Sequence, residues 1–281
     1  MAHRVGHYHV FERIGRGGMG DTYGAHDEKL HRAVALKFID AARLPDEGAH
    51  RVFVRTARSA SALSHPSICR VHEVLEPNGP PIVVMERVNG RTVRDLTASG
   101  PLEPRLVCRL GRELAEALAA AHACGIVHRN VSASNVMVTP EGHVKLMDLG
   151  LAPLPAAAEP PREPGQPVDV HSRAMQLGTP VYLAPELLRG GTPTEKSDLY
   201  AAGVVLYRMA TGQMPFPERM TPESLAEILR HAPVPPGLLA AGVPASLERA
   251  IMGLLEKSPD ARFPSAESLA ATLRVAERAG A

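Results

Sequence analysis

The 281-residue chain contains no tryptophan, only three cysteines, and aromatic residues that make up 4% of the sequence. Its hydrophobic content of 44% is ordinary for a globular protein, so the core has to be built mainly from Leu, Val, Ile and Ala. Cys69, Cys108 and Cys124 lack the spacing of metal ligands. Their odd, sparse number favours a reducing compartment over a disulfide framework.

A strong charge of either sign is also missing, because the formal net charge is +1. This balance provides no basic footprint for nucleic acid and no acidic tail. No run approaches the ~18 consecutive apolar residues of a membrane span, and the first residues lack the apolar core of a signal peptide. We therefore expect a cytoplasmic protein with no membrane segment that does not bind nucleic acid.

Residues 1–88 have the pattern of a small β-rich unit with one helix. Short β-type runs separated by turns occupy residues 8–39, and two further runs lie at residues 68–76 and 80–88. Between them, apolar residues recur at helical spacing over residues 47–63, and His65-Pro66 follows as an end signal. The pattern predicts one helix set among strands.

Residues 89–281 are predicted to be mainly helical, with no internal repeats. Residues 152–170 are rich in Pro and Ala without periodicity, which predicts a long loop. The expected fold class is α+β, a β-rich lobe followed by a larger helical lobe. Apolar patterning predicts two short strands at residues 135–138 and 143–148, and helices at 104–124, 197–211, 222–231, 244–256 and 265–278.

Gly15, Gly17 and Gly20 form a G-x-G-x-x-G pattern, in which backbone N–H groups can approach a phosphate closely. Alone, the pattern is equally typical of a hairpin turn. Asp40, which lies 20 residues after Gly20, adds a likeness to a dinucleotide-binding fingerprint. That alternative requires a helix directly after the glycines, whereas residues 21–32 have strand and turn character. It therefore receives low weight.

Further motifs follow in order along the chain. Lys37 lies in V-A-L-K on the third expected strand, H-R-N-V-S-A-S-N occupies residues 128–135, and D-L-G occupies residues 148–150. A-P-E at residues 184–186, D-L-Y at 198–200 and S-P-D-A-R-F at 258–263 come next. In wording, order and spacing these motifs resemble the bacterial, Hanks-type Ser/Thr protein kinases over essentially the whole chain.

The resemblance implies a bilobal protein-kinase fold, with a small β-rich N-lobe at residues 1–88 and a larger helical C-lobe at residues 89–281, together one kinase domain. Residues 86–88 would be the hinge, residues 128–135 the catalytic loop, and residues 148–186 the activation segment. The cofactors it implies are ATP and Mg²⁺.

Site residues are implied by the same resemblance. ATP would contact Ile14, Gly15, Gly17, Gly20, Ala35, Lys37, Met85, Glu86, Val88 and Met137. Mg²⁺ would be held by Asn135 and Asp148. Structural roles would fall to His128, Arg129, Glu186, Asp198 and Arg262.

Three catalytic positions depart from the family's pattern. Asn130 stands in place of the Asp that accepts the substrate's hydroxyl proton, and an amide cannot take up that proton. Ser132 replaces the Lys that neutralises the transferring phosphoryl group. Thr56 replaces the helix Glu that pairs with Lys37, and no carboxylate lies between Glu47 and Glu73. Lys37 is therefore expected to be left for phosphate alone.

The activation segment departs too, since after Gly150 its only hydroxyl residues other than Tyr are Ser172 and Thr179. We therefore expect a pseudokinase that binds ATP and Mg²⁺ and regulates or scaffolds a protein partner, such as an active kinase in a signalling pathway. Two alternatives stay open: an active or weakly active Ser/Thr protein kinase, and an interaction module that binds no nucleotide. The basic run Arg51, Arg55 and Arg58 is either a solvated helix face or a docking site for an acidic partner.

Overall fold

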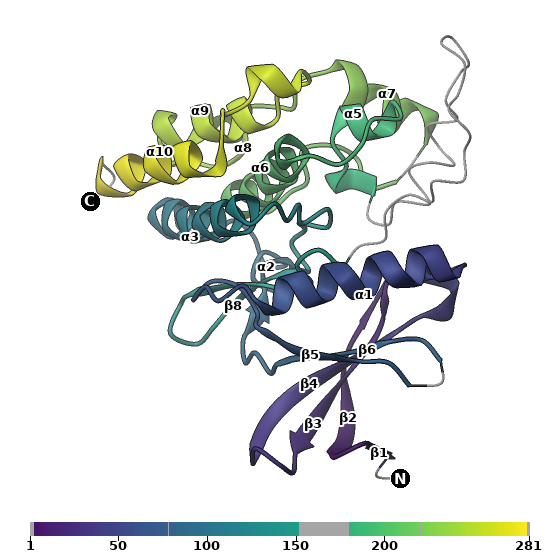
Figure 1. Ribbon diagram of the computed structural model, residues 1–281. Coiled ribbons are helices and arrows are strands. Elements are labelled where there is room, and N and C mark those ends of the chain that lie inside the picture. Colours follow the sequence, from purple (N-terminus) through teal and green to yellow (C-terminus); the bar gives the residue numbers. More distant parts are fainter. Residues whose placement is uncertain (1–2, 78, 152–179, 220, 280–281) are drawn as a thin grey trace.

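The computed structural model describes residues 3–77, 79–151, 180–219 and 221–279. Within these residues the chain forms a β-rich lobe and a larger helical lobe (Figure 1). The predicted α+β, two-lobed architecture is confirmed. The predicted loop at residues 152–170 lies outside the described residues, as do Ser172 and Thr179.

A six-stranded antiparallel sheet forms the frame of the first lobe. Alternation along β4 turns Val34 and Leu36 to one face, and Ala35 and Lys37 to the other, where α1 packs. The strand order is β1-β2-β3-β4-β6-β5, with β1 His3–Val5, β2 Tyr8–Gly17, β3 Gly20–Asp27, β4 Arg32–Ile39, β5 Val71–Leu75 and β6 Ile82–Glu86.

The single long helix of this lobe, α1 (Glu47–Ser61), begins at a side-chain cap, because Asp46 accepts a hydrogen bond from the Ala49 backbone N–H. Its buried face consists of Phe53, Val54, Ala57 and Ala60. The helix ends two residues before the predicted position 63. The N–H groups of residues 62 and 63 bond to carbonyls three residues back, which tightens the last turn.

The predicted strand at residues 68–76 is too long at its start. Ile68 and Cys69 instead contact Leu146 of a second sheet: Ile68 forms an isolated bridge with Leu146, and the Cys69 N–H donates to the Leu146 carbonyl over 2.9 Å. That sheet has the order β7-β8-β9, with β7 Arg91–Thr92, β8 Val136–Val138 and β9 Val144–Leu146. These contacts fasten the two lobes together close to Asp148.

Helices make up the rest of the described C-terminal lobe. Among the described residues, no helix has the length and apolar character that crossing a membrane would require. Four-residue helices were not predicted, because one turn is too short to show apolar periodicity. The helices are α2 Val93–Leu96, α3 Pro104–Ala123, α5 Pro185–Leu188, α6 Glu195–Thr211, α7 Pro222–Arg230, α8 Pro236–Leu239, α9 Ala245–Leu254 and α10 Ala266–Ala279.

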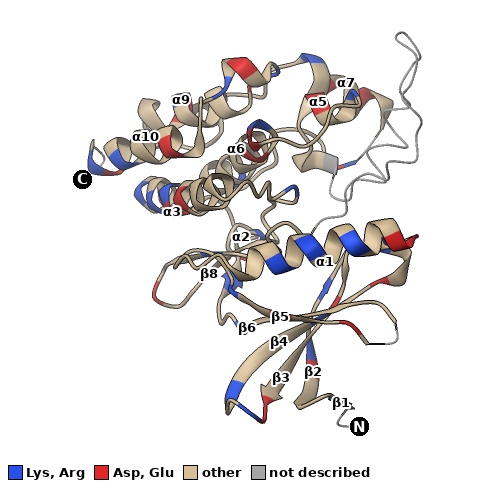
Figure 2. Cartoon of the chain, viewed as in Figure 1, with Lys and Arg blue, Asp and Glu red and all other residues tan. Residues whose placement is uncertain are grey.

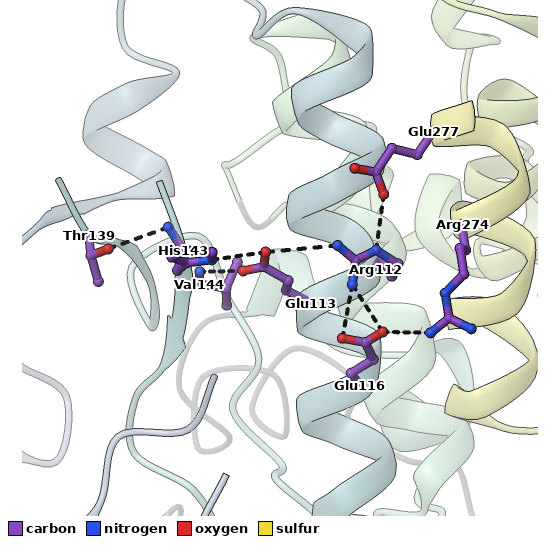
Figure 3. Close-up of polar contacts among 8 residues, drawn as sticks. All are labelled: Arg112, Glu113, Glu116, Thr139, His143, Val144, Arg274 and Glu277. Atoms are coloured by element: carbon purple, nitrogen blue, oxygen red, sulfur yellow. Dashed lines mark hydrogen bonds and ion pairs between the residues drawn. The ribbon is translucent and has the colours of Figure 1, made fainter. Parts of the chain in front are cut away.

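A polar network on α3 fixes the strand that leads to Asp148 (Figure 3). The buried Glu113 carboxylate accepts hydrogen bonds from the Val144 backbone N–H at 2.8 Å and from His143 Nδ1 at 3.2 Å. Its neighbour Arg112 joins Glu116 on α3 and Glu277 on α10 at 3.0–3.1 Å. The network therefore ties the start of β9 to the packed pair α3 and α10.

Replacing Glu113 with Ala should destabilise the protein, because the buried Val144 N–H loses its acceptor. The expected loss is about 1–3 kcal/mol in the free energy of unfolding, measured by urea denaturation. Glu113→Gln keeps an acceptor oxygen and should recover part of the loss. Glu141→Ala, at an exposed residue of the same hairpin, is the control and should stay within about 0.5 kcal/mol. An equal loss of unfolding free energy in Glu113→Ala and Glu141→Ala would contradict this role of Glu113.

Candidate nucleotide and phosphoryl-transfer site

The glycine pattern forms the turn between β2 and β3. Gly15 pairs with Thr22 and Gly17 with Gly20 across the hairpin. Gly20 has φ +136°, and a Cβ there would lie 1.9 Å from the Phe38 carbonyl oxygen, so the close approach to β4 requires glycine. The glycine pattern thus lies in a hairpin, the structure that it also allowed, and Gly20 is required there by its backbone conformation.

The dinucleotide-binding alternative is excluded, because a strand follows the glycines where that fingerprint requires a helix. Asp40 has a different role in this fold. Its carboxylate accepts from the Ala42 backbone N–H at 3.0 Å and caps the short 3₁₀ helix at Ala41–Arg43.

Lys37 and Asp148 form a direct ion pair across the two lobes. Lys37 lies on β4 between Thr22 of β3 and Val83 of β6, and its Nζ is 2.5 Å from Asp148 Oδ2. Both side chains are largely buried, with 6% and 12% exposure. The attraction between the two charges offsets part of the cost of removing them from water. The expectation that Lys37 has only phosphate to bind is therefore wrong, because Asp148 occupies it.

The turn that carries Asp148 is held in unusual backbone geometry. Asp148 has φ +60° and Gly150 has φ +67°, both in the left-handed region. A Cβ at Gly150 would lie 2.9 Å from Thr56 Cγ2, which shows how closely α1 packs against this turn. For a residue other than glycine, such a conformation costs free energy and is typical of functional sites.

Thr56 does not replace the missing carboxylate of α1. Its hydroxyl donates to the Val52 carbonyl at 2.9 Å, within the helix. Among the described residues, Asp148 is the carboxylate that pairs with Lys37. Thr56 lies at the turn, where the motif places this residue. Because it has no carboxylate, it does not compete with Asp148 for Lys37.

One buried carboxylate holds the start of the loop at residues 128–135 through hydrogen bonds. Asp198 of α6 accepts hydrogen bonds from the backbone N–H groups of His128 and Arg129, at 2.7 and 2.8 Å, and contacts His122 Nε2 at 2.9 Å. Arg129 has φ +69°, so these bonds hold a strained residue in place. Asp198 is thus placed to shape the loop.

His128 is fixed as a neutral ring by its two neighbours. Its Nε2 lies 2.8 Å from the Met147 carbonyl, an acceptor, while Nδ1 receives the Asn130 backbone N–H at 3.2 Å. One nitrogen therefore carries the proton and the other accepts. Complete burial, which disfavours the charged ring, lowers the pKa of His128 below its usual range.

The loop presents an amide where the family pattern has an acid. The Asn130 carbonyl accepts from Asn135 Nδ2 at 2.8 Å. Ser132 is buried, and its carbonyl accepts from the N–H groups of Asn135 and Val136. Asn130 and Ser132 thus lie in the same turn as Asn135, but neither side chain supplies a negative or a positive charge.

At the predicted hinge, Met85 is buried and pairs with Ala35 across the sheet. Glu86, the next residue, has its carboxylate 2.7 Å from Lys145 Nζ on β9, an ion pair that the sequence patterns did not predict. The remaining predicted ATP contacts are spread over β2, β8 and the segment after β6, with Ile14 43% exposed on β2, Met137 on β8 and Val88 after Glu86.

Glu186 and Arg262 form a bidentate pair at 2.8 and 2.7 Å. Arg262 is buried, donates also to the carbonyls of Glu256 and Lys196, and lies over the Tyr200 ring at 4.9 Å. This arrangement satisfies most donors of a buried guanidinium. It joins α5 to the segment before α10.

The residues present fit Mg²⁺ and a nucleotide phosphate. Asp148 offers a carboxylate and Asn135 an amide oxygen, the ligand atoms that Mg²⁺ takes. Asn135 Nδ2 donates to the Asn130 carbonyl, and within the described part of the chain the Asn135 amide oxygen accepts no hydrogen bond. Lys37 lies against the same carboxylate, where its ammonium group can also contact phosphate oxygens.

Comparisons with known proteins show which fold and family the chain shares. In the solved structure of the Mycobacterium tuberculosis PknI kinase domain, the same fold recurs with a TM-score of 0.76, at 24% identity and over 98% of both chains. The family model described as "Protein kinase domain" matches residues 8–272. The chain belongs to the protein kinase family.

Curated relatives narrow the likeness to bacterial serine/threonine-protein kinases. PknB of Mycolicibacterium smegmatis is 37% identical over 276 residues, which cover 96% of this chain and 43% of that protein. PknB of Mycobacterium tuberculosis is 36% identical over 278 residues, or 97% and 43%. PrkC of Bacillus subtilis is 33% identical over 272 residues, or 96% and 40%. The chain spans less than half the length of these relatives.

Proposed function

We propose that this domain is a pseudokinase, which binds ATP with Mg²⁺ and transfers the phosphoryl group little or not at all. The observation that carries the proposal is a contrast within one site, between residues that suit binding and residues that do not suit phosphoryl transfer. Lys37 and Asp148 lie against one another, and together with Asn135 they carry the chemical groups that suit phosphate and metal. At the positions for proton transfer, charge neutralisation and pairing with Lys37 the chain has Asn130, Ser132 and Thr56 instead.

ATP supplies the transferable phosphoryl group when it is bound. Asn130 can accept a hydrogen bond from a substrate hydroxyl and so orient it, but an amide does not take up its proton. Ser132 presents a dipole rather than a cation near the reacting group. Binding and orientation are thus served by this chain, while the proton has no carboxylate acceptor at the usual position.

Domain limits, partner and location are part of the proposal. We place the N-lobe at residues 1–88 and the C-lobe at residues 89–281, and we propose that the domain regulates or scaffolds a signalling protein. The three cysteines are free, with Cys69 and Cys108 buried, which supports work in the reducing cytoplasm.

Nucleotide binding should raise the melting temperature of the purified domain. At an ATP·Mg²⁺ concentration about 100-fold above Kd, the expected stabilisation is about 2.7 kcal/mol, or roughly 5–10 °C. Lys37→Met should reduce this shift strongly, because the phosphate loses its ammonium partner. The same samples should transfer almost no labelled γ-phosphate to themselves or to a generic substrate.

Two outcomes would contradict the proposal. A flat melting temperature across ATP, ADP and Mg²⁺ would favour an interaction module without nucleotide. Robust phosphate transfer that disappears in Lys37→Met would show an active kinase. Arg94→Met, at an exposed residue of α2, is the control for the loss of one cation. Its melting temperature, and the increase caused by ATP·Mg²⁺, should equal those of the wild type.

An active or weakly active Ser/Thr protein kinase is the second candidate. It is favoured by the names of the relatives, which are 33–37% identical to this chain. On this alternative a slow transfer rate is measurable in the wild type. Asn130→Asp should then raise the rate by about 10²–10⁴-fold, the usual contribution of a positioned base, with a further gain from Ser132→Lys.

The test is a single-turnover transfer assay of the wild type, Asn130→Asp and Asn130→Ala. Asn130→Ala removes the amide without adding a base, so it separates a gain in base strength from a change in shape. No transfer before or after Asn130→Asp would exclude this candidate.

A further inference from the structure

A basic hollow lies on α1, outside the proposed nucleotide site. It has a volume of about 460 Å³ and is lined by His50, Arg51, Val54, Arg55, Arg58, Ser59 and Glu76. We call it the α1 groove. Six of these residues belong to α1, and Glu76 follows the end of β5. Figure 2 shows the Lys and Arg colour recurring along α1.

The three arginines share one face of the helix. Their spacing of four and three residues places Arg51, Arg55 and Arg58 above one another over two turns. All three are exposed, while Val54 beneath them is 5% exposed and forms an apolar floor. The groove is therefore a row of guanidinium groups over a buried aliphatic residue.

The charges of this row are only partly neutralised. Arg51 pairs with Glu47 at 3.2 Å, but these side chains are 74% and 91% exposed, so the pair is weak and exchanges readily with water. Arg58 pairs with Glu76 at 2.5 Å. Among the described residues, Arg55 has no acidic partner. The lining thus has three arginines against one carboxylate.

This geometry suits an extended acidic peptide. Helix rise places Arg51 and Arg55 about 6 Å apart along the axis, and Arg51 and Arg58 about 10 Å apart. Alternate side chains of an extended chain recur at about 6.6 Å, so carboxylates two residues apart can reach successive arginines. Guanidinium groups bind carboxylates through two parallel hydrogen bonds, which gives such a row both affinity and selectivity.

We propose that the α1 groove binds an Asp/Glu-rich segment of a partner protein. Contact there bears directly on the helix that carries Thr56, and Thr56 packs against the Asp148–Gly150 turn. A bound segment therefore restrains α1 where it meets the proposed nucleotide site. Binding itself needs no nucleotide, so it is tested without ATP and stands apart from the pseudokinase proposal.

The probe is a fluorescein-labelled octapeptide of alternating Glu and Ser, titrated with the full chain and followed by fluorescence anisotropy at low salt. Arg55→Ala should weaken binding about fivefold or more, and the triple change R51A/R55A/R58A should abolish saturation. Glu76→Gln should tighten binding about threefold, because it removes a negative charge and releases Arg58. Raising the salt concentration should weaken binding in every case.

The control is R94A/R105A/R249A, which removes three exposed arginines elsewhere and the same net charge. It should stay within about twofold of the wild type, and a Gln-for-Glu peptide should not bind. Melting temperatures of all variants should match, since these side chains are exposed. Equal weakening in the control triple, or weaker binding by Glu76→Gln, would overturn the proposal. So would tighter binding to phosphatidylserine vesicles than to the peptide with the same arginine dependence.

Discussion

The ion pair between Lys37 and Asp148 is the contact on which the arrangement of the site depends. It joins β4 of one lobe to the turn after β9 of the other, with both side chains largely withdrawn from water. Each charge would be costly to bury alone, so the pair favours the relative position of the lobes in which both are satisfied. The strand that leads to this turn is held by the Glu113 carboxylate at Val144 and by the Cys69 N–H at the Leu146 carbonyl.

Around this pair, one property is shared by Asn130, Ser132 and Thr56: each has an uncharged side chain where the family's pattern has a charged one. α1 packs tightly against Gly150, as the motif implies, yet Thr56 offers only a hydroxyl that is already donated to Val52. Lys37 therefore takes the carboxylate that is also the proposed metal ligand. The loop below keeps its shape through Asp198, while its side chains lack an acid at position 130. The loop is held in shape by Asp198, while positions 56, 130 and 132 carry no charge.

Much of the fold could be predicted, because long helices and alternating strands leave periodic apolar patterns. α3 and α10 begin and end within one residue of the predicted positions. Short elements such as α5 and α8, at four residues, carry no such signal. Two ion pairs between distant segments were also missed. The Glu86–Lys145 pair and the Lys37–Asp148 pair depend on how two lobes meet, which no local pattern encodes.

The most direct test of the central claim is calorimetry of ATP binding, with and without Mg²⁺, in the wild type, Thr56→Glu and Thr56→Gln. In the wild type Lys37 neutralises Asp148, so Mg²⁺ should strengthen binding only slightly. A carboxylate at position 56 competes for Lys37 and releases Asp148, so Mg²⁺ should strengthen binding in Thr56→Glu about fivefold more than in the equally bulky Thr56→Gln. Equal Mg²⁺ dependence in all three proteins would contradict the account.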